Sequence, residues 1–380
     1  MRRRLDGGHP AGGAGRRFAV LGIYWPSKKF ADAALRPDAD PDGVAMSVDD
    51  GGIPSDVLRA ALDQLGSLLD LREDPRLGEA KAAADEVGSG AEAERRFVDS
   101  LRALLPDSSD EQDDQSDIFW SADGPELLSA LEAPVSLPPA PPSDEGGAAG
   151  FAMSGGGEDD GGAAGLLGSL AGRAAGALRL LNYATYYVMK ERAGVVGRGL
   201  NRLLAEVRAA RGDLRIHLVG HSFGARVVAA AVDGPQPLRP SSLSLLQGAF
   251  SHNAFADEVQ GRRGFFRGVV ADGKVAGPII ATHTRNDKAV GIAYAIASRL
   301  ANDVAAGVGG PDDVFGGIGR NGAMRLAAAE HRMAELGGPD SAYPPFDPGI
   351  VINLKADPFI ANHSDVANPA VANAVLSAAR

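Results

Sequence analysis

Short apolar runs alternate with longer stretches of mixed polarity along this chain. The apolar runs cover residues 17–24, 214–220, 242–247, 278–283 and 349–354. Runs of this length with many β-branched or aliphatic residues predict buried strands, and the stretches between them predict helices. Strands that alternate with helices form mostly parallel sheets. The pattern therefore predicts an α/β fold: a mostly parallel, doubly wound sheet with helices on both faces.

Several longer stretches have the apolar spacing that is typical of helices. Residues 55–71 are amphipathic, and Ser55 or Asp56 is suited to be the N-cap. Helices are also expected over 91–105, 166–210, 325–336 and 370–379. The stretch 166–210 is expected as two or three helices, interrupted near 194–199. Within it, Tyr183, Tyr186 and Tyr187 are expected to pack against the sheet.

The amino-acid composition changes between residues 106 and 162. An acidic run, a proline-rich piece and a glycine-rich piece follow one another there, over 107–117, 137–142 and 155–162. Such compositions bury too little apolar surface to offset the loss of chain entropy on folding. We therefore expect a disordered insertion at 106–162 and a disordered terminus at 1–16. One folded domain is expected from 17–105 and 163–380, and the apolar island 118–120 is expected to make a local contact.

Composition excludes several classes of protein. The chain of 380 residues carries a net charge of −11, which disfavours nucleic-acid binding. It contains no cysteine, which excludes disulfides and fits a reducing compartment such as the cytoplasm. The basic start lacks the apolar core of a secretory signal, and no apolar run is long enough to cross a bilayer.

The most specific chemical signal is Gly220-His221-Ser222-Phe223-Gly224. It follows an apolar run and precedes a helix-like stretch, which is the context of a G-x-S-x-G nucleophile elbow. Such a turn is strained and lifts the serine hydroxyl above the sheet edge, and the two glycines would let strand and helix approach closely. The alternative is an ordinary strand–loop–helix connection with an incidental serine.

This motif in its context resembles the α/β-hydrolase superfamily. The resemblance implies that Ser222 is a nucleophile and that an acid and then a histidine follow it along the chain. Among the seven histidines, His363 follows the strand expected at 349–354 and is the candidate base. His252 is the second choice. His331 is expected on the surface of a helix, and His221 is expected to point away from the nucleophile.

The candidate acid is Asp287, which follows the strand expected at 278–283. In the order that the resemblance implies, it would hold the imidazole of His363 in one tautomer. The alternative is an ordinary turn aspartate, since Asn-Asp pairs are common in loops. Asp257 is the reserve candidate.

An oxyanion hole needs two backbone N–H donors. The resemblance implies that Phe223 supplies one and that a loop after an earlier strand, often marked by His-Gly, supplies the other. No His-Gly pair occurs in the chain, whereas Trp25-Pro26-Ser27 matches a segment that follows the next strand in such hydrolases. Two interpretations are open. Either the sheet lacks its N-terminal strands and one donor, or 17–24 is the oxyanion strand and 22–27 supplies the donor.

The sequence thus predicts a serine hydrolase that cleaves a small-molecule or lipid-like carboxylic ester and needs neither a metal nor an organic cofactor. Phe250, His252 and Phe255 are candidates for substrate binding in a wall or lid, with core packing as the equal alternative. The rival hypothesis is a non-catalytic protein of the same fold, in which the acidic insertion binds or scaffolds a partner. The oligomeric state is not predicted.

Overall fold

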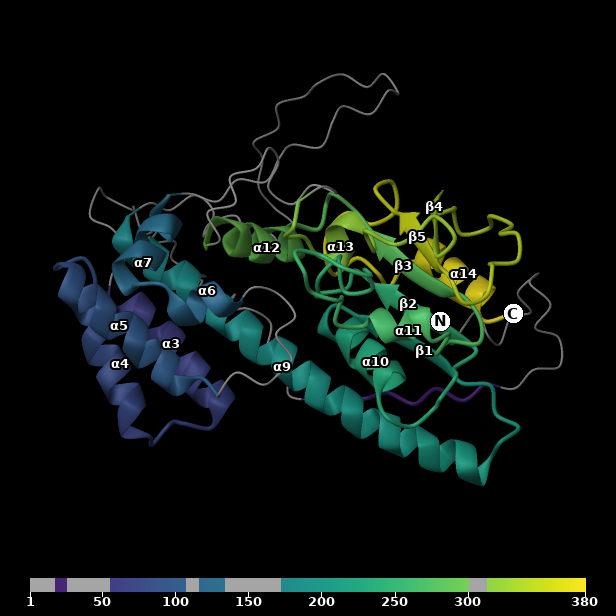
Figure 1. The fold of residues 1–380 in the computed structure, drawn as a ribbon, viewed down its shortest axis with the longest axis horizontal. Coiled ribbons are helices and arrows are strands. Elements are labelled where there is room, and N and C mark those ends of the chain that lie inside the picture. Colours follow the sequence, from purple (N-terminus) through teal and green to yellow (C-terminus); the bar gives the residue numbers. More distant parts are fainter. Residues whose placement is uncertain (1–17, 26–54, 107–115, 134–171, 301–312) are drawn as a thin grey trace, which may run out of the picture.

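The computed structural model describes residues 18–25, 55–106, 116–133, 172–300 and 313–380. Five strands form one sheet in the order β1-β2-β3-β5-β4, and each pairs in parallel with its neighbours. They are β1 (His217–His221), β2 (Ser242–Leu246), β3 (Ile279–His283), β4 (His331–Glu335) and β5 (Val351–Lys355). The predicted parallel sheet is confirmed, and Figure 1 shows its strands fanned beside helix α10.

The central strands of this sheet are buried on both faces, because alternate residues of β2, β3 and β5 enter two different apolar clusters. Leu243, Leu245 and Ile279 belong to the larger cluster, which also contains α10 (Phe223–Asp233). Ile280 and Ile352 point to the other face and pack with α14 (Pro369–Ala378). The alternation follows from the period of two along a strand. Helices therefore cover both faces, as the sequence predicts.

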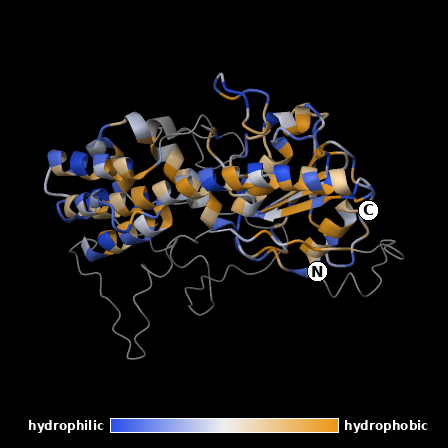
Figure 2. Cartoon of the chain, turned by 90° about the horizontal axis from the view of Figure 1, so that it is seen from below, coloured by the Kyte–Doolittle hydropathy of each residue, from blue (hydrophilic) through white to orange (hydrophobic). Residues whose placement is uncertain are grey.

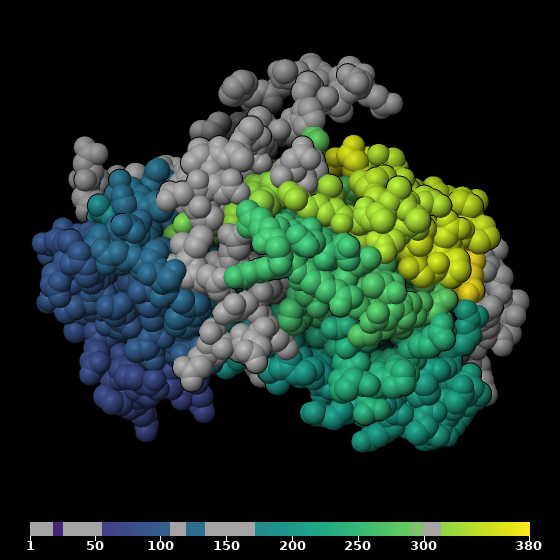
Figure 3. Space-filling model, viewed as in Figure 1, coloured from purple at the N-terminus to yellow at the C-terminus, as the bar shows by residue number. Residues whose placement is uncertain are grey.

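A helical part lies beside the sheet part, as the view in Figure 3 shows. It contains α3 (Ser55–Leu69), α4 (Pro75–Asp85), α5 (Ala91–Leu104), α6 (Ser116–Ser121) and α7 (Gly124–Glu132). Hydrophobic residues lie between its helices and along the strands in Figure 2. The long helix α9 (Arg173–Ala210) connects this part with α10. Three shorter helices complete the sheet part: α11 (Arg267–Ala271), α12 (Lys288–Leu300) and α13 (Ile318–Asn321).

Two predicted elements are wrong. The strand expected at 17–24 does not form: the described residues from 18 onward belong to none of the five strands, and Leu21 and Tyr24 are exposed. An apolar run becomes a strand only where a neighbour offers a ladder of hydrogen bonds. No helix forms over 325–336: residues 325–330 are turns and irregular structure, and His331–Glu335 form the strand β4, because pairing with β5 overrides the helical preference of these residues.

The expectations for 106–162 and for 166–210 also need correction. Helices α6 and α7 lie inside the segment expected to be disordered, and Phe119 of its apolar island is 1% exposed. Residues 107–115 and 134–162 lie outside the described part, as do 1–16. Helix α9 is continuous from Arg173 to Ala210, without the interruption expected near 194–199.

Two glycines of α9 provide a matched test of how α9 and α10 pack. A Cβ at Gly197 would lie 2.5 Å from Ala230 Cβ and 2.6 Å from the Val227 carbonyl oxygen. A Cβ at Gly199 would meet no atom within 4 Å. We expect Gly197→Ala to lower the free energy of unfolding by about 1–3 kcal/mol through overpacking. Gly199→Ala should raise it by about 0.5–1 kcal/mol, because alanine is the better helix former. Urea denaturation of both variants measures the difference; equal effects would contradict this packing.

Candidate active site

The turn between β1 and α10 holds Ser222 in a strained backbone conformation. Its φ is 56° and its ψ is −125°, a region that residues other than glycine rarely adopt. The Ser222 N–H donates to the Leu246 carbonyl oxygen at 3.0 Å, and the Ser222 carbonyl oxygen accepts from Ala249 N–H at 3.1 Å. The turn is therefore fastened to the end of β2, which compensates for the local strain.

Only the first glycine of the motif lies where the surrounding atoms leave no room for a side chain. A Cβ at Gly220 would lie 2.1 Å from the Gly224 carbonyl oxygen, so any side chain there would force strand and helix apart. A Cβ at Gly224 would meet no atom within 4 Å. The close approach expected from both glycines thus depends on Gly220 alone.

The structure brings Ser222, Asp287 and His363 together from the ends of three different strands. Ser222 follows β1, Asp287 lies four residues after the end of β3, and His363 lies on the loop after β5. His363 Nε2 is 2.8 Å from Ser222 Oγ, and His363 Nδ1 is 2.8 Å from Asp287 Oδ2. A carboxylate only accepts hydrogen bonds, so Nδ1 carries a proton and Nε2 is free to accept the serine proton.

The Asp287 carboxylate is fully buried and hydrogen-bonded on both oxygens. Oδ1 accepts from the Val290 N–H at 3.0 Å, and Oδ2 accepts from Gln247 Nε2 at 3.2 Å in addition to His363. These bonds hold the carboxylate in one orientation toward the imidazole. Gln247 has the left-handed φ of 46° and was missed in the sequence, where only its position after a strand could have indicated it.

A second set of hydrogen bonds ties the loop of Asp287 to the loop of His363. Asp357 Oδ1 accepts from Thr284 Oγ1 at 2.8 Å and from the Arg285 N–H at 3.0 Å. Asn286 Nδ2 donates to the Ile360 carbonyl oxygen at 2.8 Å. Because these contacts flank both side chains, the separation of Asp287 and His363 is set by the backbone as well as by their own hydrogen bond.

Phe223 is the first residue of α10, so its N–H has no acceptor within the helix. It is the residue after Ser222 and lies at a helix N-terminus, where partial positive charge accumulates. It can therefore donate to an oxygen that becomes negative beside Ser222 Oγ. The segment expected to supply a second donor is described only as far as Trp25, whose side chain packs against the larger core; Pro26 and Ser27 lie outside the described residues.

The residues expected to contact substrate are placed in the core instead. Phe250, His252 and Phe255 are each 0% exposed, and the two phenylalanines pack edge to face at 6.1 Å. His252 Nε2 contacts the Asp313 carbonyl oxygen at 3.1 Å, and its Nδ1 contacts Asn321. It is neither a base nor a substrate contact here, because both ring nitrogens are used. Asp257, the reserve acid, is exposed and pairs with Arg267 at 3.4 Å.

Two buried histidines predict how stability depends on pH. Burial lowers the pKa of His252 and of His283 to about 4. An unfolded chain takes up protons at these rings near pH 6.5 and the folded chain does not, so their contribution to stability is present above pH 6.5 and is lost as the pH falls toward 4. Between pH 7.5 and 5 each ring should lower the free energy of unfolding by about 2 kcal/mol. His252→Gln should show a shallower decline in urea denaturation than the parent chain; an unchanged slope would contradict a neutral buried His252.

His221 contacts the backbone of the candidate base, a contact that the sequence did not predict. Its Nε2 is 2.8 Å from the His363 carbonyl oxygen, and the two imidazole rings lie 4.9 Å apart. A carbonyl only accepts, so His221 donates from Nε2 and holds the backbone at His363. The sequence carried one signal for this residue, its position directly before Ser222.

Loss of this contact should affect the alignment of His363 more than the binding of substrate. We expect His221→Ala to lower kcat roughly three- to tenfold, the value of one ordinary hydrogen bond, with KM little changed. His221→Gln, which can still donate, should recover part of the loss. A fall in thermal stability with unchanged kcat would show that the contact serves folding alone.

Within the described ranges, no cluster of three or more His, Asp and Glu side chains could hold a metal ion. None of the helices in those ranges has both the length and the apolar character needed to cross a membrane. No protein-family model, curated protein or solved structure matches the chain.

Proposed function

We propose that this chain is a serine hydrolase of the α/β-hydrolase fold that cleaves a carboxylic ester by way of an acyl-enzyme. One observation carries the proposal: the continuous chain of hydrogen bonds from Ser222 through His363 to the buried Asp287, both links at 2.8 Å. A nucleophile, a base and a group that orients the base are the parts that acyl transfer requires.

The chemistry follows from the roles of these side chains. His363 Nε2 removes the proton of Ser222 Oγ as the oxygen attacks the ester carbonyl carbon. The carbonyl oxygen becomes negative and accepts the Phe223 N–H. When the tetrahedral intermediate collapses, the bond to the alcohol oxygen breaks and His363 returns the proton to it. Water then repeats the sequence on the acyl-serine and releases the acid.

The architecture supports the fold assignment. Three successive parallel neighbours, β1, β2 and β3, are followed in the sheet by β5, and the three site residues lie after β1, β3 and β5 in the order nucleophile, acid, histidine. The elbow at Ser222 has the strained turn that this fold uses. The candidate substrate is a small-molecule or lipid-like ester, and the scheme uses no cofactor.

A fluorophosphonate probe tests the proposal directly, because it reacts only with an activated serine. We expect stoichiometric labelling of the folded protein, located at Ser222 by peptide mass spectrometry and absent after heat denaturation. p-Nitrophenyl acetate should be hydrolysed by the same sample. A folded sample that is neither labelled nor active would favour the non-catalytic, partner-binding alternative.

A further inference from the structure

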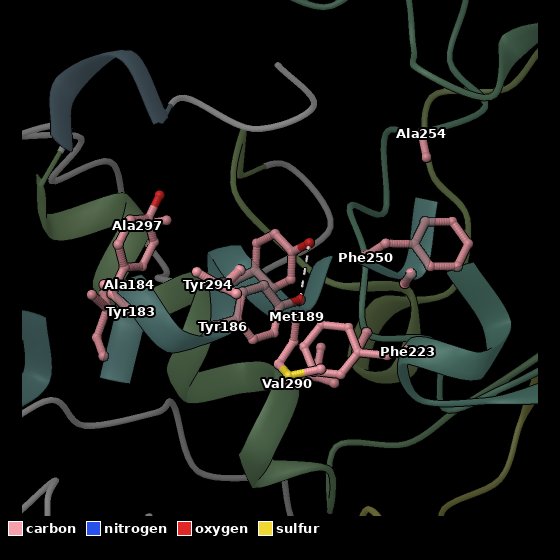
Figure 4. Close-up of a cluster of buried hydrophobic side chains, with 14 of the residues drawn as sticks. Tyr183, Ala184, Tyr186, Met189, Phe223, Phe250, Ala254, Val290, Tyr294 and Ala297 are labelled. Atoms are coloured by element: carbon pink, nitrogen blue, oxygen red, sulfur yellow. Dashed lines mark hydrogen bonds between the residues drawn. The ribbon is translucent and has the colours of Figure 1, made fainter. Parts of the chain in front are cut away.

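The loop that carries His363 is held differently from the two other parts of the candidate site. Phe223 follows the serine and Val290 lies one helical turn after the aspartate, and both are buried in the larger apolar cluster. Figure 4 shows their side chains in one group with Tyr186, whose ring lies 5.0 Å from that of Phe223. Every residue of 361–368, by contrast, is at least partly exposed. The position of His363 therefore depends mainly on hydrogen bonds.

One carboxamide, that of Asn368, closes this loop. Its Nδ2 donates to the Phe359 carbonyl oxygen at 2.9 Å and to the Asp365 carbonyl oxygen at 2.8 Å. The first acceptor precedes His363 by four residues, and the second follows it by two. The two N–H groups of the amide thus bind the two arms of the loop, one on each side of His363.

The oxygen of the same amide joins the loop to helix α14. Asn368 is the N-cap of α14, and its Oδ1 accepts from the Val371 N–H at 3.0 Å. Because an N–H only donates and a carbonyl oxygen only accepts, these three partners define which end of the amide is nitrogen. Helix α14 is itself anchored, since Ala370, Val371 and Ala374 are buried in the second apolar cluster. Asn368 therefore couples an exposed loop to a helix whose position the core fixes.

Two hydrogen bonds of short range shape the turn around His363. Asp365 Oδ2 accepts from the Ala361 N–H at 3.0 Å, and Asn362 Oδ1 accepts from the Ser364 N–H at 3.0 Å. Both bonds lie within the turn, so they define its shape but not its position relative to the sheet.

The position of the turn is set by side chains that reach it from other elements. His221 binds it from β1, and Asn286 binds it from the loop of the acid. Their acceptors are the carbonyl oxygens of residues 363 and 360, whereas Asn368 also binds a residue after His363. On the basis of the proposed function, we propose that Asn368 is a positioning residue for the reaction. It holds the imidazole within reach of the serine hydroxyl by acting through the backbone of the loop.

Asn368→Asp separates the two roles of this side chain. Aspartate caps a helix as well as asparagine does, so the bond from the Val371 N–H should remain. A carboxylate has no proton to donate, so both bonds to the loop are lost. We expect the rate constant of fluorophosphonate labelling at Ser222 to fall roughly ten- to hundredfold, because a shift of about 1 Å at the base has an effect of that size. The labelling should still reach one probe per protein.

Steady-state kinetics on the same preparation add a second readout. With p-nitrophenyl acetate, kcat should fall by a similar factor while KM stays within about twofold, since the loop acts on the chemical step rather than on binding. Asn368→Ser, which also caps a helix, provides both readouts without an added charge if Asn368→Asp fails to fold.

The matched control is Asn373→Asp, on the same helix. The Asn373 side chain is buried, and its Nδ2 donates to the Gly338 and Ser341 carbonyl oxygens at 3.1 Å and 2.9 Å. The control thus loses two bonds of the same kind, but to a loop that carries no residue of the candidate site. We expect a lower melting temperature, with the labelling rate and kcat within about twofold of the parent values when both are measured on folded protein.

The possible outcomes are distinct. Parent-like labelling rates in Asn368→Asp and Asn368→Ser would overturn the assignment and leave the proposed hydrolase intact. An equal loss of rate in Asn373→Asp would also overturn it, because lower stability would then account for the effect. Absence of labelling in the folded parent protein would contradict the proposed function itself.

Discussion

Replacing Ser222 by alanine is expected to lower ester turnover by roughly 10⁴- to 10⁶-fold and to abolish labelling by a fluorophosphonate. The variant loses the only oxygen that His363 Nε2 can activate at 2.8 Å. The backbone N–H of Phe223 remains, so weak residual catalysis over water is expected from the oxyanion contact. Initial rates with p-nitrophenyl acetate measure the change. Turnover within tenfold of the parent protein would contradict Ser222 as the nucleophile.

A second variant, Ser222→Gly, distinguishes the effect of losing the hydroxyl from the effect of backbone strain. Ser222→Gly also removes the hydroxyl, so turnover should fall as far as in Ser222→Ala. Glycine adopts a φ of 56° without the penalty paid by serine or alanine, however, so this variant should be more stable than Ser222→Ala by about 1–3 kcal/mol. Thermal or urea denaturation of the pair gives the difference. Equal stabilities would show that the elbow is unstrained.

Asp287→Asn should lower turnover by roughly 10⁴-fold while leaving the fold intact. In the parent protein the carboxylate fixes the proton of His363 on Nδ1. An amide that donates toward Nδ1 would favour the other tautomer, with the proton on Nε2. The backbone N–H of Val290 can still bond the remaining amide oxygen. We therefore expect a large loss of kcat without a matching change in thermal stability, measured on the same preparation.

The control for this variant is Asp257→Asn, at the other aspartate that the sequence offered as an acid. Its carboxylate is largely exposed to solvent, which screens the ion pair with Arg267 so that it contributes little. Turnover should stay within about twofold of the parent value. If instead Asp257→Asn inactivates the protein and Asp287→Asn does not, the assignment of the acid is wrong.

The placement of the site could be predicted from the sequence because chain order and strand ends constrain it strongly. Ser222, Asp287 and His363 each follow an apolar run, and the carboxyl ends of parallel strands meet at one sheet edge. Their meeting in the structure agrees with that order. Their catalytic roles remain predictions for the variants above to test.

Other features could not be predicted because they depend on contacts between distant segments. β4 has a mostly exposed, mixed sequence without apolar alternation, so only its pairing with β5 defines it as a strand. The glycines of α9 suggested an interruption, whereas Gly197 instead lets α10 approach closely. His221 and Gln247 support the site through single hydrogen bonds that leave no mark in the hydrophobic pattern. The same holds for the burial of Phe250 and Phe255, which an aromatic-rich loop does not distinguish from a lid.

β1, the strand that leads into Ser222, is the outermost strand on its side of the described sheet. β4 forms the other border, where Arg332 and Glu335 are exposed and discourage the addition of a foreign strand. β1 pairs only with β2 within the described residues, and Val219 is 41% exposed. A polypeptide strand that added to this border would press on the residue directly before the elbow and could shift the serine oxygen. Self-association through β1 would therefore make specific activity depend on protein concentration, a linkage between assembly and catalysis that a sheet with its nucleophile strand at the centre does not have.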